Sequence, residues 1–172
     1  RNIIKYPYYS KDHTETRGVT FEVNEDKTIS ANGVADTSLQ PTFTLDSSKN
    51  IILKANQPYT YTHSCTDETG FITIWFRDAN KKGVYIDYDE IRDGVKKSVT
   101  NSNAIYGYDS NGTPSKVITI IPKSDTYVQF DVRFKAKGQT ITNALFKPML
   151  EYGYVAHPYV PYYSGGAEYS YY

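Results

Sequence analysis

The three histidines and the single cysteine are the side chains with the most obvious capacity for catalysis. A serine or cysteine nucleophile needs a histidine base and an orienting acid close to it. Only Cys65 has a histidine nearby in sequence: His63 lies two residues before it, so on one strand the two side chains would share a face. His13 and His157 lie far from this pair. The spacing predicts a strand cysteine beside a surface histidine, and one cysteine allows no internal disulfide.

The acidic residues offer two other kinds of chemistry. A glycosidase would need two carboxylates facing each other at about 5 to 10 Å. Asp87, Asp89, Glu90 and Asp131 could supply such a pair, but so could any protein with nineteen acidic residues. Residues 109–112 (Asp-Ser-Asn-Gly) are similar to the start of a calcium loop, but the downstream glutamate is missing and turn formation explains them better.

Motifs for metal, phosphate and redox chemistry are absent from the sequence: it has no HExxH, no phosphate-binding glycine loop and no CxxC pair. We therefore expect a protein that is not an enzyme and that needs no cofactor. A structural calcium held by loop carbonyls leaves no trace in a sequence, and it stays an open alternative.

One group of side chains could recognise a carbohydrate. Sugars present flat C–H surfaces that stack on aromatic rings, and hydroxyls that hydrogen-bond to planar charged groups. Alternation along two predicted strands places aromatic and charged side chains on their polar sides. The predicted carbohydrate-binding residues are Trp75, Arg77, Tyr127, Asp131, Arg133 and, in second rank, Tyr85. The alternative is that residues 89–114 cover Trp75 and make it part of the core; whether the two strands share a sheet is left open.

Two-residue periodicity, which is typical of half-buried strands, defines the elements that would position these side chains. It is clearest at residues 71–77 and 126–135. Further strands are predicted at residues 18–23, 28–34, 42–45, 59–63, 84–88, 116–121 and 140–151, and a strand or brief turn at residues 51–53. Residues 89–114 are polar and predict a long, mostly irregular connection with a short strand near residues 104–106. No stretch of a dozen residues keeps helical periodicity, so we predict an all-β antiparallel β-sandwich, with a jelly roll as the favoured arrangement.

Length and composition limit the classes of partner. The 172 residues suit one domain, and nineteen basic residues balance nineteen acidic ones, which disfavours nucleic acid. No run of about 18 apolar residues occurs, so membrane insertion is not expected. Eighteen tyrosines favour a recognition surface, although half-buried tyrosines are also common in β-proteins.

The chain divides into a predicted sandwich module at residues 1–163 and a Gly-Gly joint with a Tyr-rich tail at residues 164–172. Three interpretations of the tail stay open: an edge strand, a contact surface for a neighbouring subunit, or a frayed end. The first residue is Arg1 rather than Met, which suggests a piece of a longer protein.

Two segments carry a family resemblance. Residues 2–8 (Asn-Ile-Ile-Lys-Tyr-Pro-Tyr) with residues 18–33 resemble the "N-L-L-x-Y-P-Y … G-[IV]-T-F … D-G-T-[IV]-x-[AV]-N-G" start of carbohydrate-binding-module-like jelly-roll domains of bacteriophage minor tail and baseplate proteins. Residues 146–153 (Phe-Lys-Pro-Met-Leu-Glu-Tyr-Gly) with residues 159–162 are similar to their "F-[RK]-P-M-L-E-x-G … Y-x-P-Y" ending. The chain departs from the pattern at Lys27, where glycine is usual, and at Val160, where glutamate is usual.

The resemblance implies a jelly-roll domain that contacts bacterial cell-surface glycans, located on a virion or another extracellular surface. Its motifs assign no ligand residue, because Pro148, Gly153 and Pro161 fix the path of the last segment. The favoured interpretation is a non-catalytic glycan-binding module of a phage tail or baseplate protein. Two alternatives remain: a structural domain that binds only neighbouring tail subunits, and a module of a bacterial surface adhesin.

Overall fold

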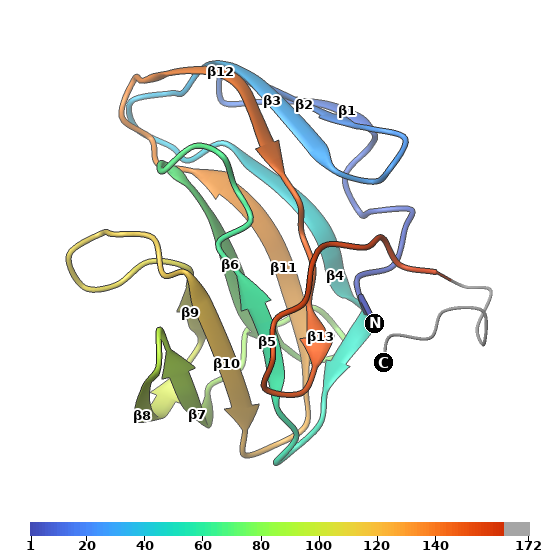
Figure 1. The fold of residues 1–172 in the computed structure, drawn as a ribbon, viewed down its shortest axis with the longest axis vertical. Coiled ribbons are helices and arrows are strands. Elements are labelled where there is room, and N and C mark those ends of the chain that lie inside the picture. The colour runs from blue at the N-terminus through green and yellow to red at the C-terminus, as the bar shows by residue number, and fades with distance from the viewer. Residues whose placement is uncertain (164–172) are drawn as a thin grey trace.

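The computed structural model describes residues 1–163, which form thirteen β-strands and no helix (Figure 1). The strands are β1 (His13–Thr16), β2 (Val19–Val23), β3 (Ile29–Val34), β4 (Thr42–Leu53), β5 (Tyr59–Thr62), β6 (Gly70–Arg77), β7 (Ile86–Arg92), β8 (Val95–Ser102), β9 (Ala104–Tyr106), β10 (Val117–Pro122), β11 (Thr126–Phe134), β12 (Thr140–Phe146) and β13 (Glu151–Tyr152). The predicted joint and tail at residues 164–172 lie outside the described residues. Within the described part, no helix is long and apolar enough to cross a bilayer.

The strands pair in three antiparallel sheets. Sheet A has the order β1-β2-β3-β12, sheet B has β4-β11-β6-β9, and sheet C has β13-β5-β10-β7-β8. Sheets A and C join where an isolated bridge pairs Cys65 with Phe146. Together they form one layer of a sandwich, and sheet B forms the other (Figure 1). The all-β antiparallel sandwich is thus confirmed, while the jelly-roll arrangement stays a prediction.

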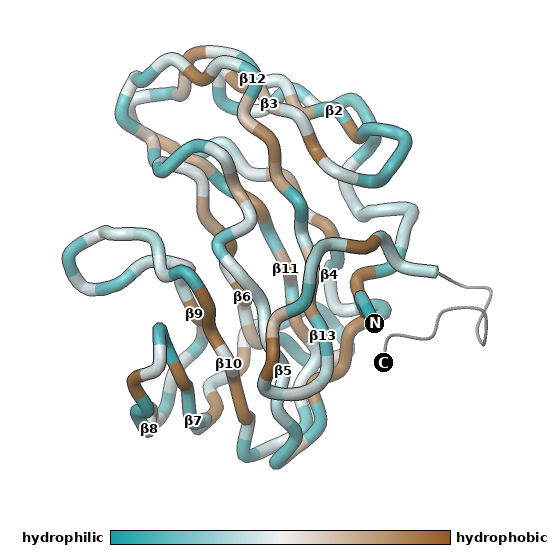
Figure 2. Tube along the Cα trace, in the orientation of Figure 1, coloured by the Kyte–Doolittle hydropathy of each residue, from teal (hydrophilic) through white to brown (hydrophobic). Residues whose placement is uncertain are grey.

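Aromatic contacts between the layers show where the core lies. Phe134 on β11 packs on Phe146 of sheet A at 5.3 Å between ring centroids, and Phe130 on the same strand packs on Tyr61 of sheet C at 6.2 Å. Both phenylalanines and the two valines between and beside them on that face of β11 are fully buried. Alternation had predicted this inward face, and Figure 2 shows hydrophobic residues recurring along β10 and β11. One strand of sheet B therefore packs on both halves of the opposite layer.

The irregular connection predicted at residues 89–114 is wrong over its first half. β7 continues to Arg92, and β8 returns beside it after a turn in which Gly94 has a φ of 83°. β8 forms the edge of sheet C and most of its side chains are exposed. A strand with no buried face needs no alternation of apolar residues, so its sequence looked like a loop. The short strand predicted near residues 104–106 is confirmed as β9.

Two other strand boundaries differ from prediction. The polar residues 46–50 do not separate two strands, because β4 runs through them as a bulge in which Ser48 has a φ of 52°. The carboxylate of Asp46 accepts the backbone N–H groups of Lys49, Asn50 and Ile51 and so satisfies the bulged backbone. The single strand predicted at residues 140–151 is two strands: β12 pairs with β3, and β13 pairs with β5.

Asn2 connects the first residues to the last described ones. Its side-chain amide donates to the carbonyl oxygens of Pro148 at 3.1 Å and Val160 at 2.9 Å. Its side-chain oxygen accepts the N–H groups of Ile4 at 3.1 Å and Leu150 at 3.3 Å. The side chain is buried, so these four bonds satisfy it without water. The two segments with the family resemblance therefore meet at this clasp.

Candidate functional site

Five of the six predicted binding residues lie on two neighbouring strands of sheet B. β6 and β11 pair directly, with Trp75 opposite Gln129 and Arg77 opposite Tyr127. Since Ile74, Phe76 and their partners point into the core, these side chains emerge on the opposite side, here named the outer face of sheet B. The question of whether the two strands share a sheet is thus answered. Trp75 and Arg77 are half-buried, so Trp75 is not sealed in the core.

Trp75 lies between two guanidinium groups. The guanidinium carbon of Arg77 is 5.4 Å from its ring centroid, and that of Arg133 is 5.7 Å from it. Each lies within the range of a cation–π contact, which orients the planar guanidinium on the indole. The outer face thus carries an arginine–tryptophan–arginine stack.

Arg133 reaches Trp75 along the sheet. Its backbone pairs with Phe71, four residues before Trp75 on β6, so its side chain must extend over the intervening pair of Thr73 and Asp131. Both members of that pair are buried, at 0% and 1% exposure. The long aliphatic part of an arginine can cover a surface in this way while the charged group stays near solvent.

Asp131 does not have the exposed role that alternation assigned to it. The strand periodicity places its side chain on the outer face. It is nevertheless buried, because the side chain of Arg133 extends over it toward Trp75. Its carboxylate accepts hydrogen bonds from Gln129 Nε2 at 2.9 and 3.2 Å. Burial raises the pKa of the Asp131 carboxyl above its ordinary value, although the hydrogen bonds to Gln129 and Thr44 oppose that shift. Asp131 therefore supports the site from beneath and is removed as a direct sugar contact.

Tyr127 and Tyr85 lie at the Arg77 end of the face. Tyr127 is half-buried and, with Arg77, lines a hollow of 490 Å³ that is also bordered by Val84 and Asp125. Tyr85 lies in the connection between β6 and β7 and is 64% exposed. It lies on neither β6 nor β11 and does not line this hollow.

Two tyrosines that sequence reasoning missed extend the aromatic surface. Tyr106 on β9 meets Trp75 edge-to-face at 5.8 Å, and Tyr108 stacks on Tyr106 at 5.5 Å. Lys135 lies over the other tyrosine of this pair, 5.1 Å from the Tyr108 centroid. The spacing of two residues between the tyrosines, at the predicted short strand, was a signal that both share one face.

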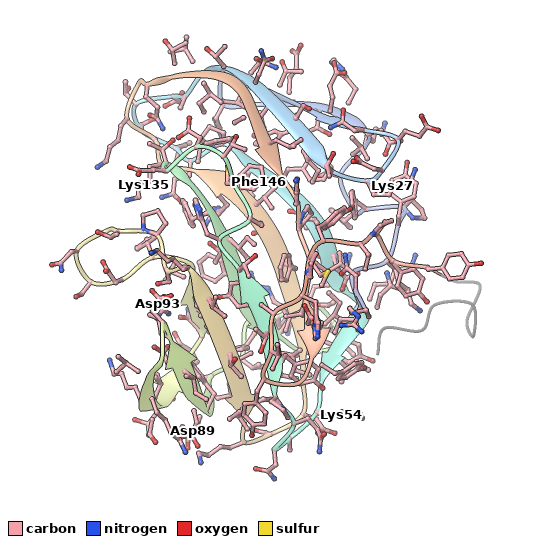
Figure 3. All side chains as sticks on the ribbon, in the orientation of Figure 1. Lys27, Lys54, Asp89, Asp93, Lys135 and Phe146 are labelled. Atoms are coloured by element: carbon pink, nitrogen blue, oxygen red, sulfur yellow. The ribbon has the colours of Figure 1, made fainter. Side chains whose placement is uncertain are left out.

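A second hollow lies at the Arg133 end of the face. It measures 590 Å³ and is lined by Ser38, Leu39, Gln40, Tyr108, Arg133, Lys135, Ala136 and Lys137. Figure 3 labels Lys135 at this end of the molecule, just beyond β11. The Nζ of Lys135 donates to the carbonyl of Gly112 at 2.5 Å, which ties β11 to the connection between β9 and β10. The lining contains three cations and no carboxylate.

The residues considered for catalysis are engaged elsewhere. His63 Nε2 lies 2.7 Å from the carbonyl of Gly70, and burial raises the pKa of the Cys65 thiol to about 12. A thiol with that pKa is a poor nucleophile at neutral pH. Both carboxylate oxygens of Glu90 accept hydrogen bonds from Arg92.

The stretch with a similarity to a calcium loop forms a turn. Asp109 Oδ1 accepts the N–H groups of Asn111 at 2.8 Å and Thr113 at 3.0 Å, which is the turn chemistry favoured from the sequence. Within residues 1–163, no group of three or more His, Cys, Asp or Glu side chains is arranged to hold a metal ion.

No protein-family model matches the chain, and no curated protein and no solved structure matches it either.

Proposed function

We propose that this chain is a non-catalytic glycan-binding module, and that it binds sugar on the outer face of sheet B. The observation that carries the proposal is the stack of Arg77, Trp75 and Arg133 on a sheet face between two open hollows. Guanidinium groups donate paired hydrogen bonds to ring hydroxyls, while the indole and the adjacent Tyr106 supply apolar surface for the sugar ring. The stack orients these groups before the ligand arrives, which lowers the entropy lost on binding.

The host setting of the proposal rests on the sequence resemblance. The opening and closing segments are similar to those of tail and baseplate modules, and the Asn2 clasp gives both segments a structural role. We therefore place the module on a phage tail or baseplate, where it would attach the particle to a bacterial cell-surface glycan.

A glycan array with the Trp75→Ala protein tests this function. We expect a subset of bacterial-surface glycans to bind the wild type, and the substitution to weaken binding at least tenfold, because a central aromatic contact contributes about 2 kcal/mol or more. Tyr154→Ala is the matched control, since Tyr154 is 60% exposed in another part of the chain. Arg77→Gln provides a second variant that removes no core volume. The proposal would be contradicted if the folded wild-type protein bound no glycan, or if Trp75→Ala and Arg77→Gln both bound glycans as tightly as the wild type.

A second candidate function is a domain that binds only neighbouring tail subunits. The observation that favours it is a group of large apolar side chains at the end of β13 and just after it: Tyr152, Tyr154 and Val155 are each at least 60% exposed. Exposed apolar groups that lie close together often mark a protein contact. In an assembled particle these three side chains would be covered and the array would be blank, whereas a glycan binder keeps the outer face of sheet B accessible.

A further inference from the structure

Arg133, at the end of the outer face that borders the 590 Å³ hollow, has unused hydrogen-bonding capacity. Nε of Arg133 donates to Thr42 Oγ1 at 2.8 Å, while its two terminal nitrogens donate to no acceptor within residues 1–163. Trp75 holds the guanidinium in place. An oriented guanidinium with free terminal N–H groups matches the geometry of a carboxylate or phosphate, which it binds through two parallel hydrogen bonds.

The cations around this hollow form no ion pair within residues 1–163. The ion pairs of the described chain include neither Arg77 nor any of the three cations that line the hollow, Arg133, Lys135 and Lys137. The chain as a whole carries no net charge, so this is a local excess of positive charge. A concave surface of one sign concentrates ligands of the opposite sign.

Two acidic residues close to the lining in sequence or on the sheet, Asp36 and Asp131, form no ion pair with these cations. The carboxylate oxygen of Asp36 accepts hydrogen bonds from the backbone of Ser38 and Leu39 and so closes its own turn. Asp131 lies under the face and is buried. Its raised pKa also reflects an environment that disfavours the negative charge there.

The walls of the hollow combine this charge with apolar surface. Leu39 is 49% exposed, and the half-buried ring of Tyr108 lies beneath Lys135. Phe71 supports that ring from the sheet at 5.0 Å. A sugar ring carrying an acidic group fits such a surface, because its C–H face can pack on the aromatic and aliphatic walls while its charge meets the cations.

We propose that the glycan recognised by this module is anionic, and that its acidic group binds in the hollow lined by Arg133, Lys135 and Lys137. The inference rests on the proposed function of the outer face and adds the class of ligand to it. The shared chemistry is a carboxylate or phosphate on a saccharide or polyol chain, and the two sources are separated by the probes below.

Matched acidic and neutral probes test the ligand class. The pairs are oligogalacturonate against its methyl ester and sialyllactose against lactose, with poly(glycerol phosphate) as the phosphate arm. We expect at least one acidic sugar to bind ten times more tightly than its neutral partner, or poly(glycerol phosphate) to bind ten times more tightly than lactose. Affinity should fall as salt is raised from 50 to 500 mM, because the cations are partly exposed and screening shortens their reach to a few ångströms.

Variants of the hollow locate the binding. Arg133→Gln should remove the preference for the acidic probe. Lys137→Glu reverses a charge on an exposed side chain that no fold contact requires, so it keeps the test valid if Arg133→Gln misfolds. We expect Lys137→Glu to weaken acidic binding at least fivefold without changing binding of neutral probes. Lys96→Glu, the same charge reversal at an exposed position on β8 of sheet C, is the charge-matched control.

Failure of this inference and failure of the proposed function give different results. If neutral glycans bind as tightly as their acidic partners, or if Arg133→Gln and Lys137→Glu both leave acidic binding unchanged, the anionic assignment is overturned and the glycan-binding function stands. If the whole array, acidic members included, gives no binding, the proposed function itself fails and the inference with it.

Discussion

At the scale of single residues, Asp131 shows what strand periodicity can and cannot predict. Alternation on β11 correctly placed it on the outer face, together with Tyr127 and Arg133. The exposure of Asp131 also depends on what covers that face. Here the side chain of Arg133 extends across Asp131 toward Trp75. The reach of a long side chain has no two-residue signature, so the sequence could predict the face of Asp131 but not its burial.

The raised pKa of Asp131 predicts a pH-dependent stability. The pKa of Asp131 in the folded protein lies above its pKa in the unfolded chain. The stability that protonated Asp131 contributes is therefore fully present below the unfolded pKa and is lost as pH rises through the folded pKa. An asparagine cannot ionise and escapes that loss. We therefore expect the free energy of unfolding of Asp131→Asn, relative to wild type, to increase as pH is raised from about 3.5 through the folded pKa and then to level off. Urea titrations at five pH values would measure this difference. A difference independent of pH would mean that Asp131 ionises in the folded protein as easily as in the unfolded chain.

At the scale of elements, the hairpin of β2 and β3 was predicted with its turn, in which Lys27 stands where the sequences that it resembles usually have glycine. Lys27 has a φ of 68°, in the left-handed region where glycine is the least strained residue. Its N–H donates to Asn24, and its Nζ lies 4.0 Å from the Tyr6 ring centroid. The cation–π contact with Tyr6, which contributes about 0.5–1 kcal/mol at an exposed site, offsets part of that strain.

Substitution of Lys27 by glycine and by alanine separates strain from contact. Both variants lose the contact with Tyr6, but only alanine keeps a Cβ at positive φ. We expect Lys27→Gly to be more stable than Lys27→Ala by about 0.5–1 kcal/mol, from a strain of about 1–2 kcal/mol less the extra unfolded-state entropy of glycine. At Glu25, which is exposed in the same turn and has no positive φ, the order should reverse. Chemical denaturation of the four proteins gives the comparison; the same order at both positions would rule out strain at Lys27.

Other elements were predicted less well, for reasons specific to their positions. β8 is an exposed edge strand, so no core required apolar residues at alternate positions. β4 continues through a polar run because the carboxylate of Asp46 replaces the missing sheet partners of the bulge. Both depend on neighbours that a single sequence does not identify. In the candidate site, Trp75, Arg77 and Arg133 were predicted together, whereas Tyr106 and Tyr108 depended on where β9 pairs.

At the scale of the whole molecule, one arginine links sheet C to the chain that borders the outer face. Arg92 on β7 donates to the carbonyls of Tyr106 at 2.9 Å and Tyr108 at 3.2 Å, and to Ser115 Oγ at 2.7 Å. Its remaining nitrogens donate to Glu90, whose side chain is 9% exposed. The aromatic pair of Tyr106 and Tyr108 is therefore positioned from the opposite layer of the sandwich.

A double-mutant cycle on Arg92 and Glu90 tests this link. Arg92→Met should cost about 3–5 kcal/mol, because it leaves the buried Glu90 carboxylate unpaired. We expect Arg92→Met with Glu90→Leu to be less destabilised than the sum of the single variants, by at least about 1 kcal/mol. The surface pair of Lys123 and Asp89, which are 51% and 19% exposed, is the control and should couple by less than about 1 kcal/mol. Additive effects at Arg92 and Glu90, measured by urea denaturation, would mean that the pair is not energetically coupled.

The clasp made by Asn2 has a mechanical consequence. Tension applied between the two ends of the described chain would cross from Asn2 to Pro148 and Val160 by way of a single buried amide, and from Ile3 to Leu150 through one backbone hydrogen bond. Sheet B lies outside that short load path. We therefore expect a pull between the two ends to open the clasp before it disturbs the outer face of sheet B.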